Sequence, residues 1–459
     1  MQYRVDPATG TRISALGLGC MRFPGTVPGH PDPRTAEAII ARAVEEGINY
    51  LDTAYLYPGN ESCVGTALER LGLRDRVLLS TKLPHGSCKR PEDFDRFFDE
   101  QLRRLRTERI DYYLIHNVTS PAQWERLQSL GIEDWVARQK AAGRIGSIGF
   151  SYHGSTGDFP VLLDAYDWDF CQIQYNYAGE RYQAGTAGLK AAAARGLAVF
   201  VMEPLLGGRL AGKLPPAARR VFERAAGEGL GVLDGGARAN GTSGDCASAE
   251  ISPDGVIGAA ARIPHDEAEV AASAFARTAD ERAAGASTPT APLDTPAAWG
   301  LAWVWDHPEV TMLLSGMTSL EQVAQNARIA SAALPSALSA AQYEVIGRVR
   351  AIFEAANRVP CTGCNYCMPC PQGINIPGCF AAYNASFAHG WFTGVAQYFT
   401  ASAIRSGHPK LATNCVRCGA CQRHCPQHIA IPDRLDDVRH RLTPGPVGAV
   451  LKLLARRDA

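Results

Sequence analysis

The chain has 459 residues, more than one average domain, so its length predicts two domains, of which one can be a large barrel. Its 46 Lys and Arg residues balance 46 Asp and Glu residues, which excludes a general polyanion-binding protein and predicts no nucleic-acid partner. The chain starts without the apolar segment of a secretory signal and has no run of about eighteen apolar residues. We therefore expect a cytoplasmic protein without membrane contact, in which fourteen cysteines do not form a disulfide framework.

Short apolar runs rich in β-branched residues alternate with longer amphipathic segments over roughly the first three hundred residues. This alternation predicts βα units with right-handed crossovers, and eight such units match a (β/α)8 TIM barrel, an α/β fold. A doubly wound open sheet is the alternative, but no predicted strand is followed by GxGxxG. The predicted strands cover residues 13–20, 49–53, 77–82, 110–116, 145–151, 170–176, 197–203 and 310–316.

Residues 227–293 are rich in Ala, Gly, Ser and Thr, a composition that predicts a long flexible insertion with one helix near 266–284. The predicted organisation is therefore a barrel over residues 1–355 that contains this insertion, followed by a small domain over 356–459. From residue 360 onward ten Lys or Arg residues face four Asp or Glu residues, so the second domain is basic.

Four polar residues follow successive predicted strands. Asp52 and Tyr57 follow the second strand, Lys82 ends the third and His116 ends the fourth. Because the carboxyl ends of barrel strands meet at one face, these side chains should share a pocket. We expect the Lys82 ammonium to lower the pKa of Tyr57, Asp52 to hold Lys82, and His116 to hydrogen-bond a carbonyl oxygen, a set suited to reducing C=O by hydride transfer. Taken singly, each residue could equally be a solvated rim residue or, for Tyr57, part of the core.

These residues lie in segments that resemble the aldo-keto reductase superfamily. The matching segments are LGLGCMRF, INYLDTAYLYPGNE, LLSTKL, IDYYLIHN, IGFS and LSGMTSLEQVAQN, and they span roughly residues 1–350 apart from the insertion. The resemblance implies that Asp52, Tyr57, Lys82 and His116 form the catalytic tetrad, with Tyr57 as the general acid. It also implies that an extended nicotinamide cofactor, NADPH or NADH, lies across the barrel mouth.

The resemblance assigns further residues to the cofactor. Ser151 and Gln172 fall where the family holds the carboxamide, and Met202 stands where many members stack an aromatic ring on the nicotinamide. Tyr152 replaces a frequent Asn. Along the pyrophosphate and adenosine the resemblance places Leu205, Gly207, Gly316, Met317, Thr318, Gln322 and Asn326.

The cofactor's 2′-phosphate distinguishes NADPH from NADH. Gly316 replaces a frequent lysine and Gln322 a frequent arginine at this subsite, but the hydroxyls of Thr318 and Ser319 at a helix N-terminus can still bind phosphate. NADPH is therefore favoured over NADH.

Two cysteine motifs lie in the second domain. Triplets of thiolates at x2 spacing can wrap one face of a cubic cluster, and a fourth cysteine before proline usually ligates the other cluster. The spacing thus predicts two 4Fe-4S clusters, with zinc and unliganded thiols as the alternatives. One cluster would take Cys361, Cys364, Cys367 and Cys425, and the other Cys415, Cys418, Cys421 and Cys370.

Residues 380–404 between the motifs have a helical pattern, so this domain is expected to be an α-helical dicluster ferredoxin-like module. The segment PCTGCNYCMPCPQGINIP resembles the first motif of an aldo-keto reductase subgroup with a C-terminal 4Fe-4S ferredoxin-type domain.

The sequence therefore predicts an NAD(P)H-dependent oxidoreductase that reduces a small aldehyde or ketone. A hydride carries two electrons and each cluster takes one, so the clusters are structural, sensing or for exchange with an external carrier such as a ferredoxin. The alternative is a nicotinamide-binding redox sensor or electron-transfer subunit without carbonyl turnover. A flavin recruited to the barrel is a third possibility.

Overall fold

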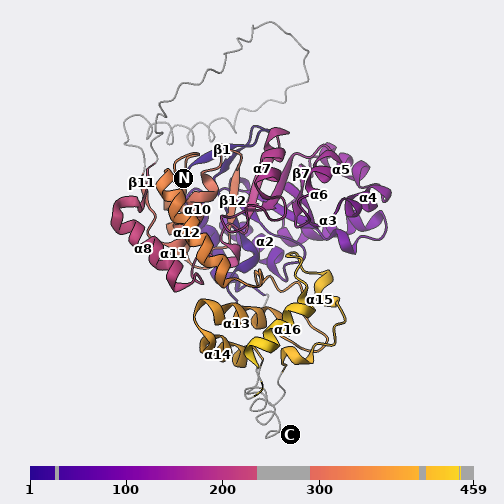
Figure 1. Cartoon of the computed structure of the whole chain (residues 1–459). Coiled ribbons are helices and arrows are strands. Elements are labelled where there is room, and N and C mark those ends of the chain that lie inside the picture. The colour runs from indigo at the N-terminus through magenta and orange to yellow at the C-terminus, as the bar shows by residue number, and fades with distance from the viewer. Residues whose placement is uncertain (26–29, 235–289, 403–409, 444, 446–459) are drawn as a thin grey trace.

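The computed structural model describes residues 1–25, 30–234, 290–402, 410–443 and 445. Figure 1 shows a barrel with a small helical module packed against it. The predicted helix near 266–284 and most of the predicted insertion lie outside the described residues.

Eight parallel strands form a closed barrel in the order β12-β3-β4-β5-β6-β7-β8-β9. The predicted (β/α)8 fold is thereby confirmed, and all eight predicted strands are present. Their bounds are β3 (Leu16–Gly19), β4 (Tyr50–Asp52), β5 (Leu78–Leu83), β6 (Ile110–Val118), β7 (Ile145–Tyr152), β8 (Phe170–Gln174), β9 (Ala198–Met202) and β12 (Met312–Ser315).

A hairpin of β1 (Tyr3–Val5) and β2 (Arg12–Ser14) precedes the barrel. Ile13 of this hairpin packs with Tyr50, Tyr112 and other buried side chains inside the barrel, and the Tyr112 hydroxyl donates to Asp6 Oδ2 at 2.7 Å. The prediction of one strand over 13–20 is wrong in this respect, because residues 12–14 pair with β1 and only residues 16–19 join the barrel.

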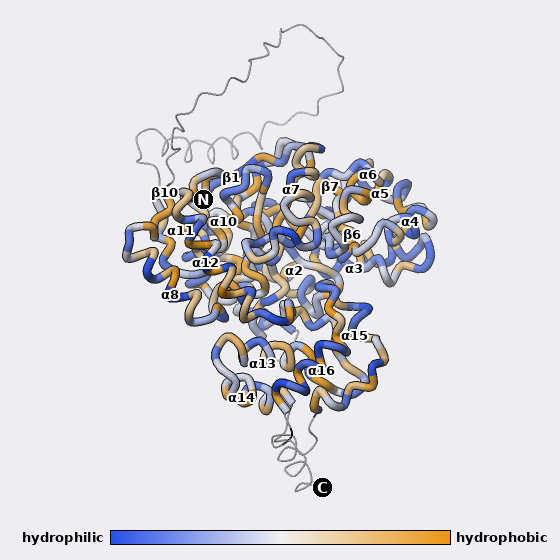
Figure 2. The backbone as a smooth tube through the Cα atoms, in the orientation of Figure 1, coloured by the Kyte–Doolittle hydropathy of each residue, from blue (hydrophilic) through white to orange (hydrophobic). Residues whose placement is uncertain are grey.

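Helices surround the barrel. Polar side chains cap several of them: Asp32 Oδ1 accepts from the Thr35 N–H at 2.8 Å, and Ser339 forms a capping box with Gln342. The hydropathy along the chain shows apolar stretches recurring in these helices (Figure 2). They are α1 (Pro33–Glu45), α2 (Asn60–Leu71), α3 (Glu92–Leu105), α4 (Pro121–Ser129), α5 (Ile132–Ala141), α6 (Asp158–Asp164), α7 (Gly185–Ala194), α8 (Pro216–Ala225), α10 (Pro296–Trp305), α11 (Leu320–Ala330) and α12 (Ala340–Ala356).

The two described ends of the predicted insertion are paired. Strand β10 (Val232–Asp234) runs antiparallel to β11 (Thr290–Pro292). The expectation of an unpatterned loop is therefore wrong at both ends, where Leu233 and Ala291 are buried in the barrel's hydrophobic core.

The module has its own hydrophobic core, which includes Phe380, Tyr398, Leu435 and Val438. The helix predicted over 380–404 is instead two helices, because the chain turns at Gly390, whose φ of 96° favours glycine. The module's helices are α13 (Ile376–Ala388), α14 (Trp391–Ala401), α15 (Ala420–Arg423) and α16 (Ile431–Leu442).

The module is built from two copies of one backbone unit. Each triplet of cysteines has left-handed residues at the same two places, Gly363 and Asn365 in the first copy and Arg417 and Gly419 in the second. Each copy then runs through Cys-Pro-Gln-x-Ile-x-Ile-Pro into a helix, α13 or α16. The repeat is therefore longer than the cysteine spacing alone indicated.

No helix in the described ranges is both long enough and apolar enough to cross a bilayer.

Candidate active site and cysteine cavities

A cavity of about 470 Å³ opens at the carboxyl ends of the barrel strands and is here called the carbonyl cavity, after the substrate group that the sequence leads us to expect there. Consecutive strands each contribute a polar or sulfur-containing residue to its lining, which is why residues distant in sequence meet here. These are Asp52, Lys82, His116, Ser151, Gln172 and Met202, and Tyr57 joins them from the loop after β4.

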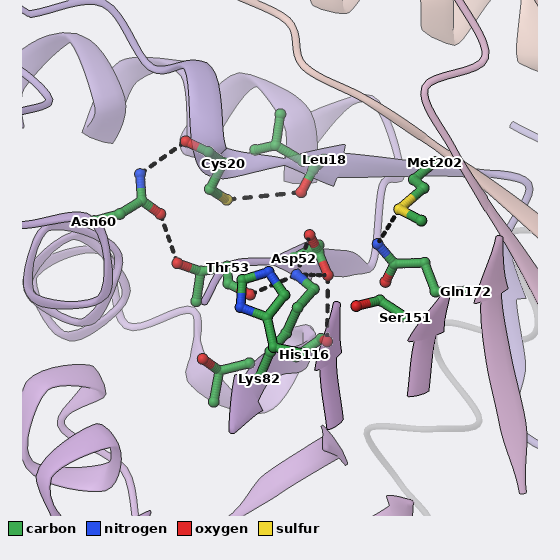
Figure 3. A network of polar contacts seen from close by, with 12 residues as sticks. Leu18, Cys20, Asp52, Thr53, Asn60, Lys82, His116, Ser151, Gln172 and Met202 are labelled. Atoms are coloured by element: carbon green, nitrogen blue, oxygen red, sulfur yellow. Dashed lines mark hydrogen bonds and ion pairs between the residues drawn. The ribbon is translucent and has the colours of Figure 1, made fainter. Parts of the chain in front are cut away.

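Asp52 and Lys82 form a buried ion pair at the base of the cavity (Figure 3). Lys82 Nζ lies 2.7 Å from both carboxylate oxygens of Asp52 and donates to the Thr53 carbonyl at 2.7 Å. Burial raises the pKa of Asp52, and the Lys82 ammonium opposes that rise. The lysine is thus held in one position by acceptors on two neighbouring residues.

Tyr57 keeps its proton in this arrangement. Burial first, and then Tyr366 and Asp52, raise the pKa of Tyr57 well above its ordinary value. Lys82 Nζ is 5.2 Å from the centre of the Tyr57 ring, and its charge is balanced by Asp52. The expectation that Lys82 lowers this pKa is therefore wrong in this arrangement, and the Tyr57 hydroxyl stays protonated.

His116 is neutral in this cavity. Burial first, and then the nearby Lys82, lower its pKa well below the ordinary value. Its ring lies edge-on to Tyr57, with centroids 5.8 Å apart. A neutral imidazole can donate one N–H to an acceptor without carrying a full charge.

Polar networks behind the cavity hold these residues in place. Gln101 Nε2 donates to the Lys82 carbonyl at 3.1 Å and to Glu61 Oε1 at 2.9 Å. Thr53 donates to Asn60 Oδ1 at 2.6 Å, and Asn60 donates to the Cys20 carbonyl at 2.8 Å (Figure 3). These buried polar groups therefore hold the backbone of Lys82 itself and that of Thr53, whose carbonyl accepts from the Lys82 ammonium.

Most residues assigned to the cofactor line the same cavity: Ser151, Gln172, Met202, Leu205, Gly207, Gly316, Thr318, Gln322 and Asn326. Gln172 Nε2 lies 3.6 Å from Met202 Sδ (Figure 3), so the amide and the thioether are adjacent in the cavity. Met317 is the exception: its side chain is 1% exposed and packs in the hydrophobic core, because it points away from the cavity that its neighbours line.

The far end of the cavity lies at the N-terminus of α11. Ser319 caps this helix, and Gln322 Oε1 accepts from the Thr318 N–H at 2.8 Å. Arg22, which sequence reasoning missed, also lines the cavity. Its side chain packs over Gly316, where an added Cβ would lie 3.6 Å from Arg22 Cδ. A guanidinium and hydroxyls at a helix N-terminus are suited to a phosphate.

The eight motif cysteines surround two small cavities in the module. Cys361, Cys364, Cys367 and Cys425 line one, here called the inner cavity; Cys370, Cys415, Cys418 and Cys421 line the other, here called the outer cavity. Each cavity thus takes its fourth cysteine from the opposite copy of the repeat, in the sets that the spacing predicts.

The donor set of each cavity fits a multinuclear cluster. Across the described ranges, no three His, Cys, Asp or Glu side chains converge as one metal ion requires. Four thiols spread around a cavity suit a cubic iron-sulfur cluster better than a single tetrahedral zinc. Burial raises the pKa of Cys364 to about 11 and that of Cys367 to about 12, so these thiolates need positive metal ions to be stable.

The barrel holds the module next to the inner cavity, mainly through main-chain carbonyls. Arg209 Nη1 donates to the Cys361 carbonyl at 2.8 Å, Gln183 Nε2 to the Pro426 carbonyl at 3.0 Å, and Arg22 Nη2 to the Thr362 carbonyl at 3.4 Å. The Tyr182 hydroxyl donates to the Gln427 carbonyl. The carbonyl cavity and the inner cavity therefore share a wall, which includes Cys364 and Pro426.

Sequence reasoning missed three further residues of the carbonyl cavity: His153, Glu203 and Tyr366. Burial lowers the pKa of His153 to about 4, and burial raises the pKa of Glu203 to about 7 against the nearby Arg22. His153 lies just past a predicted strand end, which is a usable signal. Tyr366 lies between two cysteines of the module, where the sequence does not indicate a contact with the barrel.

A (β/α)8 barrel with a polar cavity at its strand ends and a fused cysteine-rich module defines the class of protein. The model of the aldo/keto reductase family matches residues 15–345, and that of a 4Fe-4S dicluster domain matches residues 360–430. The chain therefore belongs to the aldo/keto reductase family and carries a C-terminal 4Fe-4S dicluster domain.

Curated relatives match parts of the barrel. Aldo-keto reductase YhdN of Bacillus subtilis is 34% identical over 125 residues, which cover 25% of this chain and 38% of YhdN. The uncharacterized oxidoreductase YrpG of the same organism is 28% identical over 237 residues, which cover 46% of this chain and 69% of YrpG. The first of these relatives is thus matched over less than half of its length.

Solved structures share the fold. An aldo-keto reductase from Klebsiella pneumoniae in complex with NADPH is 23% identical, with a TM-score of 0.51 over 76% of this chain and 95% of that one. A structure of an aldo/keto reductase from the same organism with NADP and acetate is 22% identical, with a TM-score of 0.50 over 76% and 96%. At these identities the comparison establishes the barrel fold.

Proposed function

We propose that the chain is an NAD(P)H-dependent oxidoreductase that reduces the carbonyl group of a small aldehyde or ketone. The observation that carries this proposal is the convergence of Tyr57, His116 and the buried Asp52–Lys82 pair at the base of one cavity. The NADPH in the Klebsiella pneumoniae relative supports the nature of the cofactor.

The protein's own groups would polarise the carbonyl and supply a proton. A bound nicotinamide would supply the hydride. Tyr57, held neutral by burial, would donate its proton to the carbonyl oxygen, and His116 would donate a hydrogen bond to the same oxygen. Lys82, fixed by Asp52 and the Thr53 carbonyl, places a positive charge 5.2 Å from the Tyr57 ring, where it would stabilise the phenolate left after proton transfer.

The remaining lining residues would hold the cofactor along the barrel mouth. Ser151, Gln172 and Met202 lie on the nicotinamide side, and Leu205, Gly207 and Asn326 lie along the rest of the cavity. Arg22, Thr318 and the N-terminus of α11 offer a cation and N–H donors for a phosphate. These groups favour NADPH over NADH, with Arg22 in place of the lysine and arginine that this chain lacks at positions 316 and 322.

Two 4Fe-4S clusters would fill the inner and outer cavities. The shared wall supports a role for the inner cluster in shaping the carbonyl cavity, and the outer one is open to an external electron carrier because Cys418 is exposed. The alternative function, a nicotinamide-binding redox sensor or electron-transfer subunit, is favoured by the same shared wall, which brings the inner cavity next to the carbonyl cavity.

The test replaces the proposed acid. In anaerobically reconstituted protein, Tyr57→Phe should lower kcat/KM for carbonyl reduction about 10²- to 10⁴-fold while NADPH binding is kept. Tyr55→Phe is the matched control, since Tyr55 packs edge-on against Phe97 and does not line the cavity. Equal activity in Tyr57→Phe and the unmodified protein would contradict the assignment of Tyr57.

Electron paramagnetic resonance separates the two functions. The reductase predicts no reduced-cluster signal with NADPH alone and a signal with dithionite, because a hydride carries two electrons together and each cluster accepts one. A signal with NADPH, together with no turnover across a broad panel of aldehydes and ketones, would instead establish the sensor or electron-transfer role.

A further inference from the structure

Tyr366 extends from the iron-sulfur module into the carbonyl cavity. It lies between Cys364 and Cys367, and it lines the carbonyl cavity together with Cys364 and Pro426. Its hydroxyl is 3.4 Å from His116 Nε2, and the two rings are nearly perpendicular, with centroids 6.4 Å apart. The same hydroxyl faces Tyr57 closely enough to raise the pKa of Tyr57.

An oxygen that contacts both Tyr57 and His116 occupies the place that a substrate's carbonyl oxygen needs. For the proposed reduction Tyr57 and His116 must both reach one oxygen atom, and in this structure the oxygen that lies beside both belongs to Tyr366. We propose that the Tyr366 hydroxyl occupies the carbonyl-oxygen position in the substrate-free protein, so that a carbonyl compound binds only by displacing it. The proposal rests on the proposed function, because that function assigns Tyr57 and His116 as the donors.

The module holds Tyr366 in this position. The loop that carries it begins at Cys361, whose carbonyl accepts from Arg209 at 2.8 Å, and the next carbonyl, of Thr362, lies against Gly207 and Arg22. At the equivalent place of the second copy stands Ala420, and that copy's triplet lines only the outer cavity. The second copy thus keeps the left-handed turns of its triplet without a tyrosine, so these turns do not require this side chain.

The size of the substrate follows from this arrangement. A carbonyl group at the end of a slender molecule can replace the Tyr366 hydroxyl after a small shift of the ring. A ketone with bulk on both sides must displace the whole side chain. We therefore expect small aldehydes to be preferred, and Tyr366→Ala, which imitates the second copy, to extend reduction to bulkier ketones.

The decisive experiment measures binding without turnover. Acetate, whose carboxylate oxygens imitate a carbonyl oxygen, is titrated by calorimetry into protein loaded with NADP⁺. Tyr366→Phe keeps the ring and removes only the competing oxygen, so acetate should bind roughly three- to tenfold more tightly, the equivalent of one hydrogen bond that no longer has to be broken. Tyr383→Phe, in α13 against Phe387 and away from the cavity, should leave the affinity unchanged.

Unchanged or weaker acetate binding in Tyr366→Phe would overturn the proposal, since Tyr366 would then be a bystander or a substrate-holding group. Iron and sulfide content are measured in each variant. If Tyr366→Phe loses its clusters, Tyr366→Leu, which also lacks the hydroxyl, is judged by the same affinity change.

The two proposals fail in different ways. Tighter acetate binding in Tyr366→Phe with no carbonyl reduced by any variant would retain the role of Tyr366 and refute the reductase. Carbonyl reduction whose KM for a small aldehyde does not fall in Tyr366→Phe would retain the reductase and refute the role of Tyr366.

Discussion

The two copies of the module's repeat share the turns of their triplets and the segment that follows Cys-Pro, but they have different surroundings. In the first copy Tyr366 enters the carbonyl cavity, where the second copy has Ala420. In the second copy His428 reaches the His153 carbonyl of the barrel, where the first copy has Gly373. The cysteine spacing fixes the shared backbone, and single substitutions on it determine which copy contacts which part of the barrel.

Both sets of barrel contacts meet at the inner cavity. The exchange of the fourth cysteine places Cys425, from the second copy, beside the triplet of the first, so the residues after Cys425 also lie against the barrel. The inner cavity shares Cys364 and Pro426 with the carbonyl cavity, whereas the outer cavity shares no lining residue with it. The two cavities should therefore respond differently when a ligand is removed.

The largest expected difference comes from the cysteines. Cys364→Ser and Cys418→Ser should each lower iron content by about four atoms per chain. Only Cys364→Ser should also lower carbonyl reduction, on the order of a hundredfold, because Cys364 belongs to the wall that the inner cavity shares with the carbonyl cavity. Iron analysis and steady-state kinetics measure both, and equal losses of activity would show that the inner cavity has no special connection to the barrel.

A smaller effect is expected on stability when the pH is lowered. Because burial lowers the pKa of His153 from 6.5 to about 4, the unfolded chain binds a proton between these pH values and the folded chain does not. His153 should therefore contribute its full stabilisation above pH 6.5. As the pH drops toward 4, the free energy of unfolding should fall by at most ~3 kcal/mol from this residue.

Thermal unfolding at pH 7 and pH 5 measures this loss. His153→Gln should reduce the pH dependence, and His30→Gln, at an exposed site, should not. A variant at His153 with unchanged pH dependence would show that other groups are responsible.

The smallest expected effect tests how closely the barrel and the module pack against each other. Gly207 and Gly208 both have left-handed φ values, 64° and 85°, so alanine at either costs about 1–2 kcal/mol of backbone strain. Only at Gly207 would the added Cβ meet the module, 2.6 Å from the Thr362 carbonyl. Gly207→Ala should therefore lower the melting temperature further than Gly208→Ala, and equal shifts would show that the module can move away at little cost.

The sequence predicted the barrel and the cysteine sets because each follows a repeating rule. Alternating strands and helices specify a parallel barrel, and strand ends specify where Asp52, Lys82 and His116 meet. Triplets closed by Cys-Pro specify the exchange of the fourth cysteine, and the structure places Cys425 and Cys370 accordingly.

What the sequence did not predict depends on packing between the two parts. Tyr366 lines the carbonyl cavity only because the module docks at the barrel mouth, and no local pattern specifies that docking. The direction of the Tyr57 pKa shift was wrong because the sequence showed a lysine nearby but not that Asp52 neutralises it in a buried site.

Several donors at the docking surface belong to the barrel, and their acceptors are peptide carbonyls of the module. Arg209, Gln183 and Tyr182 thus bind atoms that every amino acid possesses. Substitutions at the module positions that supply only these carbonyls should leave the docking intact, whereas substitutions at the barrel donors should weaken it. A foreign module with the same cysteine spacing could accordingly be grafted onto this barrel, provided that its backbone follows the same course and that it keeps the side chains that contact the barrel, Tyr366, Gln427 and His428.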